Sequence, residues 1–418
     1  MKTRFRLIPD LAEFIDARLA ELPHPMALEW PGGKAGAPGA PVRLKLHDAE
    51  VLAWLASGSI GKVADAYVRG RLEIEGSLHD VMATAAELVG DPVRDGVAMP
   101  WQRWLRRWRT RLFGHSRRDA ENIRFHYDVS DDFFALWLDP LRVYSCAYYR
   151  ERDMSLAQAQ QAKLDHVCRK LRLAPGQRFL DVGAGWGGLL LWAAEHYGVQ
   201  ALGVTLSRNQ HAHVNRLIDQ KGLRGRVEMR LLDYRELSSY GEFDRIASIG
   251  MFEHVGRDHL DEYFRLLARL VRPGGLIMNH GITAGGTAND QLGAGMGDYI
   301  GTYIFPGGEL EHVSEVTRTL SEGGLELLDA ENLRPHYART LWDWSDALES
   351  RIGEARALTS EATVRAYRMY LAGCAMSFER GWLALYQLLA SRPDGQVDSG
   401  PMRGAQSLYP FNRDYMYR

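Results

Sequence analysis

The segment from Asp181 to Gly188 carries the residues whose types and spacing point most directly to chemistry. It reads Asp-Val-Gly-Ala-Gly-Trp-Gly-Gly and joins an apolar run to a helix-like stretch. Glycines at such a junction let the backbone approach a ligand closely at the edge of a parallel sheet. The Asp181 carboxylate two residues before Gly183, the Gly-x-Gly-x-Gly spacing, and Asp233 after a later apolar run favour S-adenosylmethionine over a dinucleotide. A purely structural turn is the alternative.

The place where many nucleotide-binding sheets carry an acidic residue for the ribose hydroxyls is neutral in this chain. It reads Val204-Thr205-Leu206-Ser207, with Gln210 one helical turn further on. Ribose recognition then falls either to neutral hydrogen-bonding groups or to a carboxylate from elsewhere in the chain.

Alternating strand-like and helix-like segments from residue 119 onward predict the parallel α/β sheet that positions these residues. The predicted strands are RFLDV before the glycines, VQALGVTL, RVEMRLLD, FDRIASIG and GGLIMNHG. The stretch WGGLLLWAAEHYG predicts the helix that the glycines open. Residues 361–390 predict one long helix rich in Met and aromatic side chains, either plain core or one wall of an acyl-chain groove.

Residues 1–100 predict a small mixed α+β domain. An amphipathic first helix precedes a Gly- and Pro-rich loop at 31–41, a strand at 42–46 and a helix at 48–57. An extended pair over YVRGRLEIEGSL and a helix over HDVMATAAELV follow. The order of elements resembles sterol-carrier-type lipid-binding domains, and a structural cap is the alternative.

Residues 101–118 predict a basic linker helix that begins WQRWLRRWRTRL. Its Trp and Leu side chains share one helical stripe, and Arg103, Arg106 and Arg107 fall outside that stripe. Such a helix suits the headgroup layer of an anionic membrane. The alternative is a linker whose Trp face packs on the next domain while its Arg side chains are solvated.

The composition of the 418 residues is that of a globular protein with two or three domains. With 51 Lys and Arg against 53 Asp and Glu, the net charge of −2 gives no global field for nucleic acid. Three widely spaced cysteines indicate free thiols in a reducing compartment. No apolar stretch of about 18 residues predicts a membrane span, and acidic residues in the first helix argue against a signal peptide. We therefore expect a cytoplasmic protein.

Seven motifs, which include the glycine segment described above, taken together and in order, resemble one known family. They are FHYDVSDDFFALWLDP, YSCAYY, LDVGAGWGG, GVTLSRNQ, SIGMFEHVG, YIFPGGEL and HYARTLWDW. Over about residues 119–390 the chain is similar to the cyclopropane-fatty-acyl-phospholipid synthases, whose relatives include mycolic-acid cyclopropane synthases and fatty-acyl methyltransferases. The resemblance implies a Rossmann-like class I methyltransferase domain at 119–418, with a mostly parallel doubly wound sheet, behind the N-terminal α+β domain.

The resemblance also implies the reaction and its cofactors. Methyl transfer from S-adenosylmethionine to a cis double bond of a membrane phospholipid's acyl chain would be followed by ring closure, with a bound bicarbonate ion as general base. By motif match, the residues expected around the cofactor are Tyr127, Ser130, Tyr144, Ser145, Asp181, Gly183, Gly185, Thr205, Leu206, Gln210, Asp233 and Tyr234. Those expected around the base are Cys146, Glu253, His280, Ile282 and Tyr337, with Cys146 and Ile282 contributing mainly backbone amides.

Two positions depart from the family pattern. The loop reads Gly-Ala-Gly where Gly-Cys-Gly is usual, and we expect little effect because the backbone makes the contact. Many members read His-Thr-Ile at the base, where this chain has His280-Gly281-Ile282. Gly281 could loosen the amide that faces the ion, which bears on ring closure rather than on methyl transfer.

The chemistry supports these residue types. Methyl transfer to an alkene leaves a carbocation, so the site must be dry and lined by aromatic faces, each worth about 0.5–2 kcal/mol toward a cation. A small anion near the transferred methyl then removes a proton. Thiol catalysis by Cys146 and a zinc site of Cys146, His280 and Glu253 are disfavoured, so we expect no metal.

Three functions stay open at this point. The first is a cyclopropane synthase bound peripherally to the inner membrane through an anionic surface, with unsaturated phospholipids as substrate. The second is a fatty-acyl methyltransferase that leaves a methyl or methylene branch, and the third is a non-catalytic lipid-binding protein. A homodimer is an open alternative to a monomer, and nucleic acid is not an expected partner.

Overall fold

The structure is a computed structural model that describes residues 11–22, 24–56, 59–89, 129–287, 295–305, 307–408 and 412–417. The chain divides into two compact units. The first comprises residues 1–130, 290–306 and 348–377, and the second comprises 131–289, 307–347 and 378–418. The predicted helix at 101–118 and Tyr127 lie outside the described residues. The predicted domain boundaries at residues 100 and 119 lie there too and stay predictions.

The second unit is built on a seven-stranded sheet of order β10-β11-β9-β8-β5-β6-β7. Its strands are β5 (Arg178–Val182), β6 (Gln200–Thr205), β7 (Val227–Leu231), β8 (Phe243–Ile249), β9 (Val271–Ala284), β10 (Glu326–Asn332) and β11 (Leu383–Ser391). From β9 to β7 all neighbours pair in parallel, while β11 pairs antiparallel with both β9 and β10. The five predicted strands are thus confirmed, together with the mostly parallel sheet.

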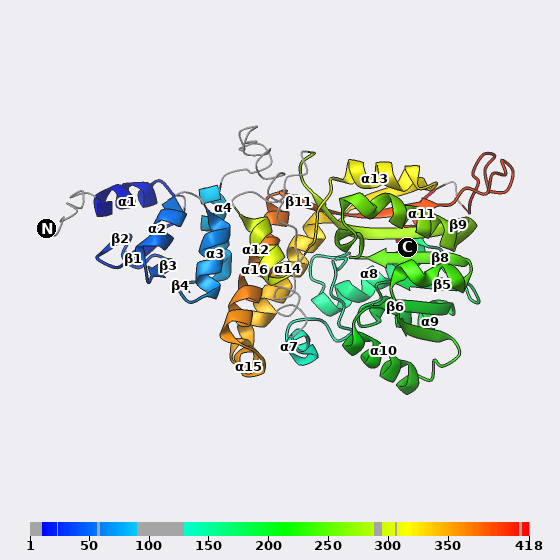
Figure 1. Ribbon diagram of the computed structural model, residues 1–418, viewed down its shortest axis with the longest axis horizontal. Coiled ribbons are helices and arrows are strands. Elements are labelled where there is room, and N and C mark those ends of the chain that lie inside the picture. The colour runs from blue at the N-terminus through cyan, green and yellow to red at the C-terminus, as the bar shows by residue number, and fades with distance from the viewer. Residues whose placement is uncertain are drawn as a thin grey trace. The chain divides into compact units, whose positions relative to one another are not determined.

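Helices cover both faces of this sheet, as a doubly wound fold requires. They are α7 (Asp131–Ala135), α8 (Leu156–Lys170), α9 (Gly188–Tyr197), α10 (Arg208–Gln220), α11 (Leu260–Leu270), α13 (Val313–Glu322), α14 (Arg334–Ser350) and α17 (Asp414–Tyr417). Figure 1 shows α11 and α13 on one side of the sheet and α9 and α10 on the other. One buried apolar cluster joins the sheet to α8, α9 and α10, and a second joins it to α11 and α13.

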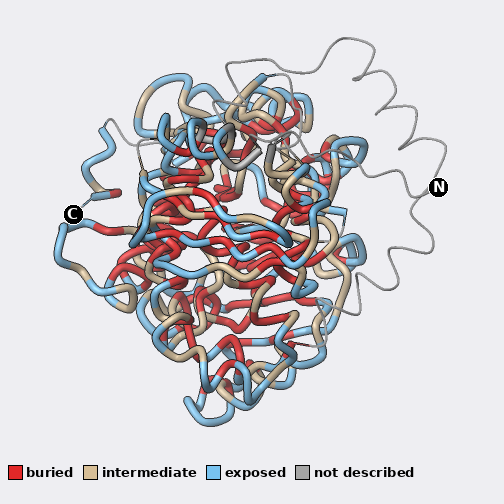
Figure 2. Tube along the Cα trace, turned by 90° about the vertical axis from the view of Figure 1, so that its left-hand side faces the viewer, coloured by how far each residue is buried: buried red, intermediate tan, exposed pale blue. Residues whose placement is uncertain are grey.

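Short 3-10 turns complete the second unit at the ends of its strands. They are η1 (Tyr234–Tyr240), η2 (Phe252–His254) and η3 (Arg257–His259). Figure 2 shows buried residues along the central strands, which both helical layers shield from water. Such burial positions polar side chains at the strand ends in a dry environment.

The first unit contains a four-stranded sheet of order β2-β1-β3-β4. Its strands are β1 (Met26–Trp30), β2 (Gly33–Gly36), β3 (Val42–Leu46) and β4 (Leu72–Glu75), and its helices are α1 (Leu11–Ala20), α2 (Ala49–Ala56), α3 (Ile60–Val68), α4 (Leu78–Val89), α12 (Met296–Tyr303), α15 (Ile352–Leu358) and α16 (Glu361–Glu379). Residues from the later part of the chain therefore complete a unit that the sequence predicted from residues 1–100 alone.

Three element predictions were wrong. The loop at 31–41 contains strand β2, which forms because Gly33–Gly36 pairs antiparallel with β1. The extended pair over YVRGRLEIEGSL is the end of α3 followed by β4 alone. The long helix at 361–390 ends at Glu379, and residues 383–391 form β11 instead.

None of the helices in the described part of the chain combines the length and the apolar character that crossing a bilayer needs.

Candidate active site

The glycine loop connects β5 to α9, and its backbone at Gly185 is not covered by other atoms of the protein. Gly183 and Gly185 have φ of +77° and +55°, a region that favours glycine. The amides of Gly183 and Ala184 both donate to the Val204 carbonyl, at 3.1 and 2.9 Å, which anchors the loop to the end of β6. A Cβ added at Gly185 would meet no atom within 4 Å. The loop therefore leaves room for a ligand to lie against its backbone, which fits S-adenosylmethionine.

A buried charge pair lies behind this loop. Burial raises the pKa of Asp181 to about 7, against the opposing effect of Lys163. Burial lowers the pKa of Lys163 to about 8. Its ammonium donates to the Ser145 hydroxyl at 2.9 Å, and the Gln160 amide donates to the Ser145 carbonyl at 2.8 Å. Helix α8 thus fixes Ser145, a predicted cofactor residue, through Lys163 and Gln160.

The predicted ribose-side residues lie together after β6. The Thr205 hydroxyl donates to Gln210 Oε1 at 2.7 Å, and the Ser207 hydroxyl caps α10 by accepting from the Gln210 amide at 3.3 Å. Leu206 is 66% exposed between them. The structure therefore offers a neutral Thr and Gln pair at this place, one of the two alternatives that the sequence left open.

The predicted adenine-side residues follow β7. Arg235 holds the pKa of the Asp233 carboxyl below its usual range through a side-chain hydrogen bond, so Asp233 is ionised and can accept. The Asp233 carboxylate pairs with the exposed Arg235 guanidinium at 2.6 Å. Tyr234 packs edge-on against Tyr263, with ring centroids 5.6 Å apart. Because exposed ion pairs contribute little free energy, Asp233 can exchange Arg235 for a ligand amino group at small cost.

Glu253 lies buried against strand β9. Its Oε1 accepts a 2.7 Å hydrogen bond from the Ile282 amide, and its own carbonyl accepts from the Glu309 amide at 3.1 Å. Burial raises the pKa of Glu253 to about 7. Its Oε2 has no hydrogen-bond partner among the described residues. The Ile282 amide predicted to face an ion therefore already binds Glu253.

The contact between Glu253 and β9 depends on Gly281. A Cβ at Gly281 would lie 2.2 Å from Phe252 Cε1 and 2.8 Å from Glu253 Oε1, well inside normal contact. The departure from the family pattern at Gly281 therefore leaves room for Phe252 and Glu253.

His280 is buried on β9, two residues before Ile282. Like Glu253, it has a buried polar atom without a hydrogen-bond partner among the described residues. Gln387 on β11 lies directly opposite, with its Nε2 3.2 Å from His280 Nδ1. Because an amide nitrogen only donates, this contact fits the tautomer in which Nδ1 accepts and Nε2 carries the proton. Burial lowers the pKa of His280 well below its ordinary value, which keeps the ring neutral. Its Nε2 has no hydrogen-bond partner in the described part of the chain.

The remaining two predicted base residues, Tyr337 and Cys146, both contact the Leu333 carbonyl, Tyr337 through its backbone amide and Cys146 through its thiol. This oxygen accepts from the Tyr337 amide at 3.0 Å and from the Cys146 thiol at 3.9 Å. The Leu333 amide donates to the Leu385 carbonyl on β11, and Leu385 is the register partner of Ile282 on β9. Contacts through Leu333 and Leu385 thus link Cys146 and the Tyr337 backbone to Ile282 on β9. Burial raises the pKa of the Cys146 thiol strongly, so this cysteine is no thiolate nucleophile.

A continuous path of aromatic rings connects the glycine loop to the base residues. Trp186, in the loop, packs on Phe134 with centroids 5.1 Å apart. Phe134 packs on Tyr144 at 5.5 Å, Tyr144 on Trp344 at 5.4 Å, and Trp344 on Tyr337 at 6.1 Å. These side chains form an apolar, cation-tolerant wall between the two parts of the site.

Sequence reasoning missed Lys163, Gln387 and Leu333. Gln387 had a readable signal, since it is the one amide side chain within the apolar run LALYQLLAS. Lys163 lies in a helix with mixed polar and apolar residues, where nothing marks it as buried. Ser130, a predicted cofactor residue, is exposed and directly precedes α7. Among the described residues, no cluster of three or more His, Cys, Asp or Glu is arranged to hold a metal ion.

Comparisons with known proteins agree with this geometry. The sequence model of the mycolic acid cyclopropane synthetase family matches residues 114–388. A probable fatty acid methyltransferase of Pseudomonas putida is 42% identical over 405 residues, which cover 96% of this chain and 98% of that protein. A probable fatty acid methyltransferase of Mycobacterium tuberculosis is 35% identical over 94% of this chain and 97% of its own length.

Two solved structures resemble about two thirds of the chain. The cyclopropane synthase MmaA2 of Mycobacterium tuberculosis has a TM-score of 0.62 at 37% identity, over 65% of this chain and 97% of that one. The mycolic acid cyclopropane synthase CmaA1, complexed with SAH and CTAB, has a TM-score of 0.61 at 38% identity, over 66% of this chain and 99% of that one.

Proposed function

Because the chain belongs to the mycolic acid cyclopropane synthetase family and is an S-adenosylmethionine-dependent methyltransferase, we propose that it builds cyclopropane rings on unsaturated phospholipid acyl chains. The observation that carries the proposal is the pair of buried atoms, Glu253 Oε2 and His280 Nε2, that lack partners in the described part of the chain. His280 lies on β9, and Glu253 contacts β9 through the Ile282 amide. Methyl transfer itself does not need such a site, whereas the loss of a proton that completes the ring needs a group to accept that proton.

The first step is alkylation of the double bond. S-Adenosylmethionine, when bound, supplies an electrophilic methyl group, and Gly183, Gly185 and the Thr205–Gln210 pair would hold it. The alkene electrons form the new carbon–carbon bond and leave a cation on the acyl chain. We propose that the rings of Tyr144, Trp344 and Tyr337, which pack on one another, stabilise that charge and exclude water.

The second step removes a proton from the transferred methyl group as the ring closes. His280 offers an N–H donor at Nε2, and Glu253, with its pKa near 7, offers either a proton or a lone pair at Oε2. A donor on β9 and a carboxyl group in η2 that contacts the same strand would suit a small oxyanion. A bicarbonate ion held there would supply the general base.

A second candidate product keeps the same first step. The relative from Pseudomonas putida, similar over nearly the whole chain, is named a probable fatty acid methyltransferase. If a hydride shift first moves the cation to the carbon that bears the new methyl group, loss of a proton from that methyl group leaves a methylene branch without a ring, and a separate reductase would have to convert it to a methyl branch. The ring and the methylene branch would share the cofactor and the aromatic wall, and they differ in whether a hydride shift precedes the loss of the proton.

The substrate implies a membrane partner. Burying a methylene is worth about 0.8 kcal/mol, so an acyl chain leaves a bilayer only for another apolar site. We propose that the enzyme binds peripherally to an anionic surface on the cytoplasmic side of the inner membrane. The Trp and Arg pattern of residues 101–112 supports this proposal.

The product spectrum tests the proposal. Purified protein, S-adenosylmethionine, bicarbonate and vesicles of a monounsaturated phospholipid are incubated, and the lipids are analysed by mass spectrometry and proton NMR. Gain of one CH₂ group with loss of the olefin signal and upfield cyclopropane protons is expected. The same mass gain without upfield protons would assign the branched product instead. The Glu253→Gln variant, which keeps the size of the side chain, should bind cofactor but lose turnover.

A further inference from the structure

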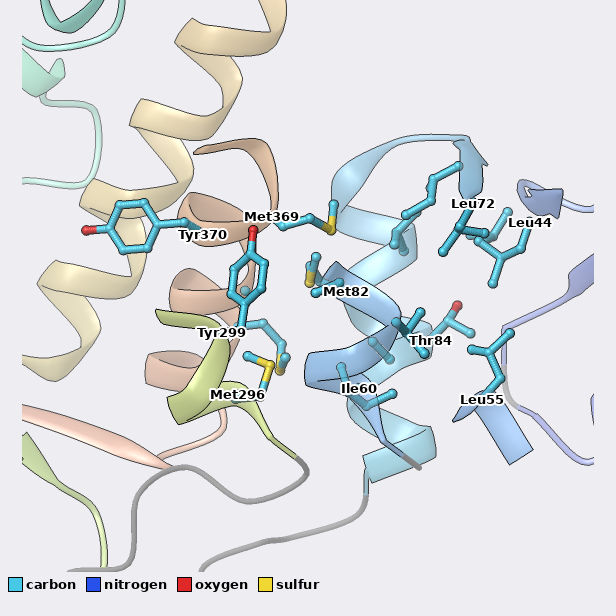
Figure 3. A pocket seen from close by; sticks show the side chains of 18 of the residues that line it. Leu44, Leu55, Ile60, Leu72, Met82, Thr84, Met296, Tyr299, Met369 and Tyr370 are labelled. Atoms are coloured by element: carbon cyan, nitrogen blue, oxygen red, sulfur yellow. The ribbon is translucent and has the colours of Figure 1, made fainter. Parts of the chain in front are cut away.

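Buried charge distinguishes the second unit from the apolar cavity of the first unit. Among the described residues that line that cavity there is no Asp, Glu, Lys, Arg or His, and Figure 3 shows Met82, Met296 and Met369 around it. In the second unit, by contrast, only 1% of Lys163 on α8 is exposed. A buried ammonium is stable only with hydrogen-bond acceptors or opposite charges beside it, because no water solvates it. The partners of Lys163 therefore indicate what this charge does.

The Lys163 ammonium bonds to one hydroxyl and interacts with two carboxylates. The hydroxyl is that of Ser145, which accepts from the ammonium at 2.9 Å. Burial lowers the pKa of Lys163 to about 8, and the Asp139 and Asp181 carboxylates act in the opposite direction. At neutral pH the side chain is therefore still mainly an ammonium. An ammonium has no lone pair with which to accept, so this hydrogen bond runs from Lys163 to Ser145.

The backbone around Ser145 is held by other side chains. It lies in a segment without regular secondary structure. The Gln160 amide of α8 donates to the Ser145 carbonyl at 2.8 Å, and the Thr340 hydroxyl of α14 accepts from the Ala147 amide at 3.0 Å. Two helices thus fix this backbone without the help of Lys163. Replacing Lys163 should therefore change the Ser145 hydroxyl and leave the segment in place.

This segment packs against the glycine loop. A Cβ added at Gly188, where the loop enters α9, would lie 2.9 Å from Val143 Cγ2. Ser145 follows Val143 by two residues and is half-buried, whereas Lys163 is fully buried. A ligand that lies against the loop therefore has access to the hydroxyl of Ser145 and not to the ammonium behind it.

The contact with Lys163 sets the direction in which the Ser145 hydroxyl bonds to a ligand. A hydroxyl has one proton and two lone pairs. Because the oxygen accepts from Lys163, its own proton is available for an acceptor in front of the loop. Hydrogen bonds to an ionised acceptor are about twice as strong as those between neutral groups. The carboxylate at the amino-acid end is the anionic group of S-adenosylmethionine, so it is the acceptor that gains most.

We propose that Lys163 is a positioning residue that turns the Ser145 hydroxyl toward the carboxylate of S-adenosylmethionine. Ser145 contacts the cofactor, and Lys163 acts through it by making its hydroxyl a donor. The protein consequently distinguishes its cofactor from analogues that lack the carboxylate. This role rests on cofactor binding alone and goes beyond the proposed ring closure.

The experiment compares three ligands by calorimetry on the full-length protein. They are S-adenosylhomocysteine, its decarboxylated analogue, and methylthioadenosine, which lacks the whole amino-acid end. We expect Lys163→Met to weaken binding of S-adenosylhomocysteine about tenfold and that of the other two by less than about twofold. Ser145→Ala should give the same pattern. The double variant should bind S-adenosylhomocysteine no more weakly than Ser145→Ala, because both changes remove one interaction.

Lys170 of the same helix provides the matched control. It is buried like Lys163, but its ammonium pairs with Glu331 instead of a predicted cofactor residue. Lys170→Met also removes a buried ammonium from α8, so it should lower stability in denaturant unfolding. The ratio of the affinities for S-adenosylhomocysteine and its decarboxylated analogue should stay at the native value.

Two results with folded Lys163→Met would overturn the proposal. One is an equal loss of affinity for all three ligands, which would assign a purely structural role to the lysine. The other is an unchanged ratio between S-adenosylhomocysteine and its decarboxylated analogue. If Lys163→Met does not fold, Ser145→Ala decides in its place, because the lysine acts only through that hydroxyl; a native ratio there overturns the proposal, and a lost ratio supports it. A lipid spectrum without cyclopropane leaves these affinities unaffected, so the failure of the proposed reaction is distinguishable from the failure of this role.

Discussion

Replacing Gly281 by alanine tests the geometry on which the base site depends. The added Cβ would lie 2.2 Å from Phe252 Cε1 and 2.8 Å from Glu253 Oε1, and ordinary contact begins at 3.4 Å. The Phe252 ring must therefore retreat by about 1.2 Å and the carboxylate by about 0.6 Å. Phe252 is buried, so its retreat disturbs the packing around it.

Two effects of different size follow from this shift. Overpacking of a buried site costs about 1–3 kcal/mol, so we expect the free energy of unfolding to fall by that amount. Displacing a catalytic group by about 1 Å can cost up to 100-fold, so we expect turnover to fall between tenfold and 100-fold. Cofactor affinity should change by less than about threefold, because Gly281 does not line the glycine loop.

The assay measures release of S-adenosylhomocysteine with unsaturated phospholipid vesicles, together with denaturant unfolding. Phe252→Leu combined with Gly281→Ala should recover part of both losses, because the smaller side chain leaves space for the new methyl group. Gly353→Ala, in an exposed helix, is the control and should change neither quantity. Native turnover and native stability in Gly281→Ala would refute the assignment of Glu253 to this strand.

Three further predictions concern the pH dependence, the cofactor loop and the membrane. The pKa of Glu253 in the folded protein, about 7, lies above its ordinary value of 4.5. Between these two pH values the folded protein keeps a proton that the unfolded chain releases. The free energy of unfolding therefore falls as the pH rises from 4.5 to 7. Glu253→Gln should therefore unfold at a higher denaturant concentration than the native protein at pH 8 but not at pH 4.5, and equal midpoints at both values would contradict the burial. Gly183→Val forces a β-branched residue into positive φ and blocks the loop, so calorimetry should detect no S-adenosylhomocysteine binding; retained binding would mean that the loop is misassigned. Charge reversal of Arg103, Arg106 and Arg107 to Glu should abolish sedimentation with anionic vesicles at low salt, and salt-independent binding of the native protein would argue for the packed-linker alternative.

The sequence predicted the glycine loop and the strand and helix beside it correctly because their signals are local. The loop from Asp181 to Gly188 sits between a strand and a helix that each have clear patterns, and the backbone conformation follows from glycine itself. The Thr205–Gln210 contact likewise lies within one turn of a helix start. Short-range contacts of this kind depend on few residues, so the sequence specifies them directly.

The parts that could not be predicted depend on pairing between distant residues. An apolar run such as 383–391 is compatible with a buried strand or a buried helix, and only its pairing with β9 decides. Strand β2 forms in a Gly-rich segment because β1 offers it an edge. The packing of Phe252 on Gly281 joins two segments that no sequence period relates.

The position of β11 in the sheet has a consequence for the order in which the protein is made. Strands β5 to β9 are neighbours in the sheet and leave the ribosome first, so the loop that faces the methyl donor can form on the nascent chain. Within the sheet of the described residues, strand β10 pairs with β11 alone, and β11 is synthesised about fifty residues later and must insert between β10 and β9. His280 therefore gains its contact with Gln387 late, and the part of the site that we propose to remove a proton matures after the glycine loop.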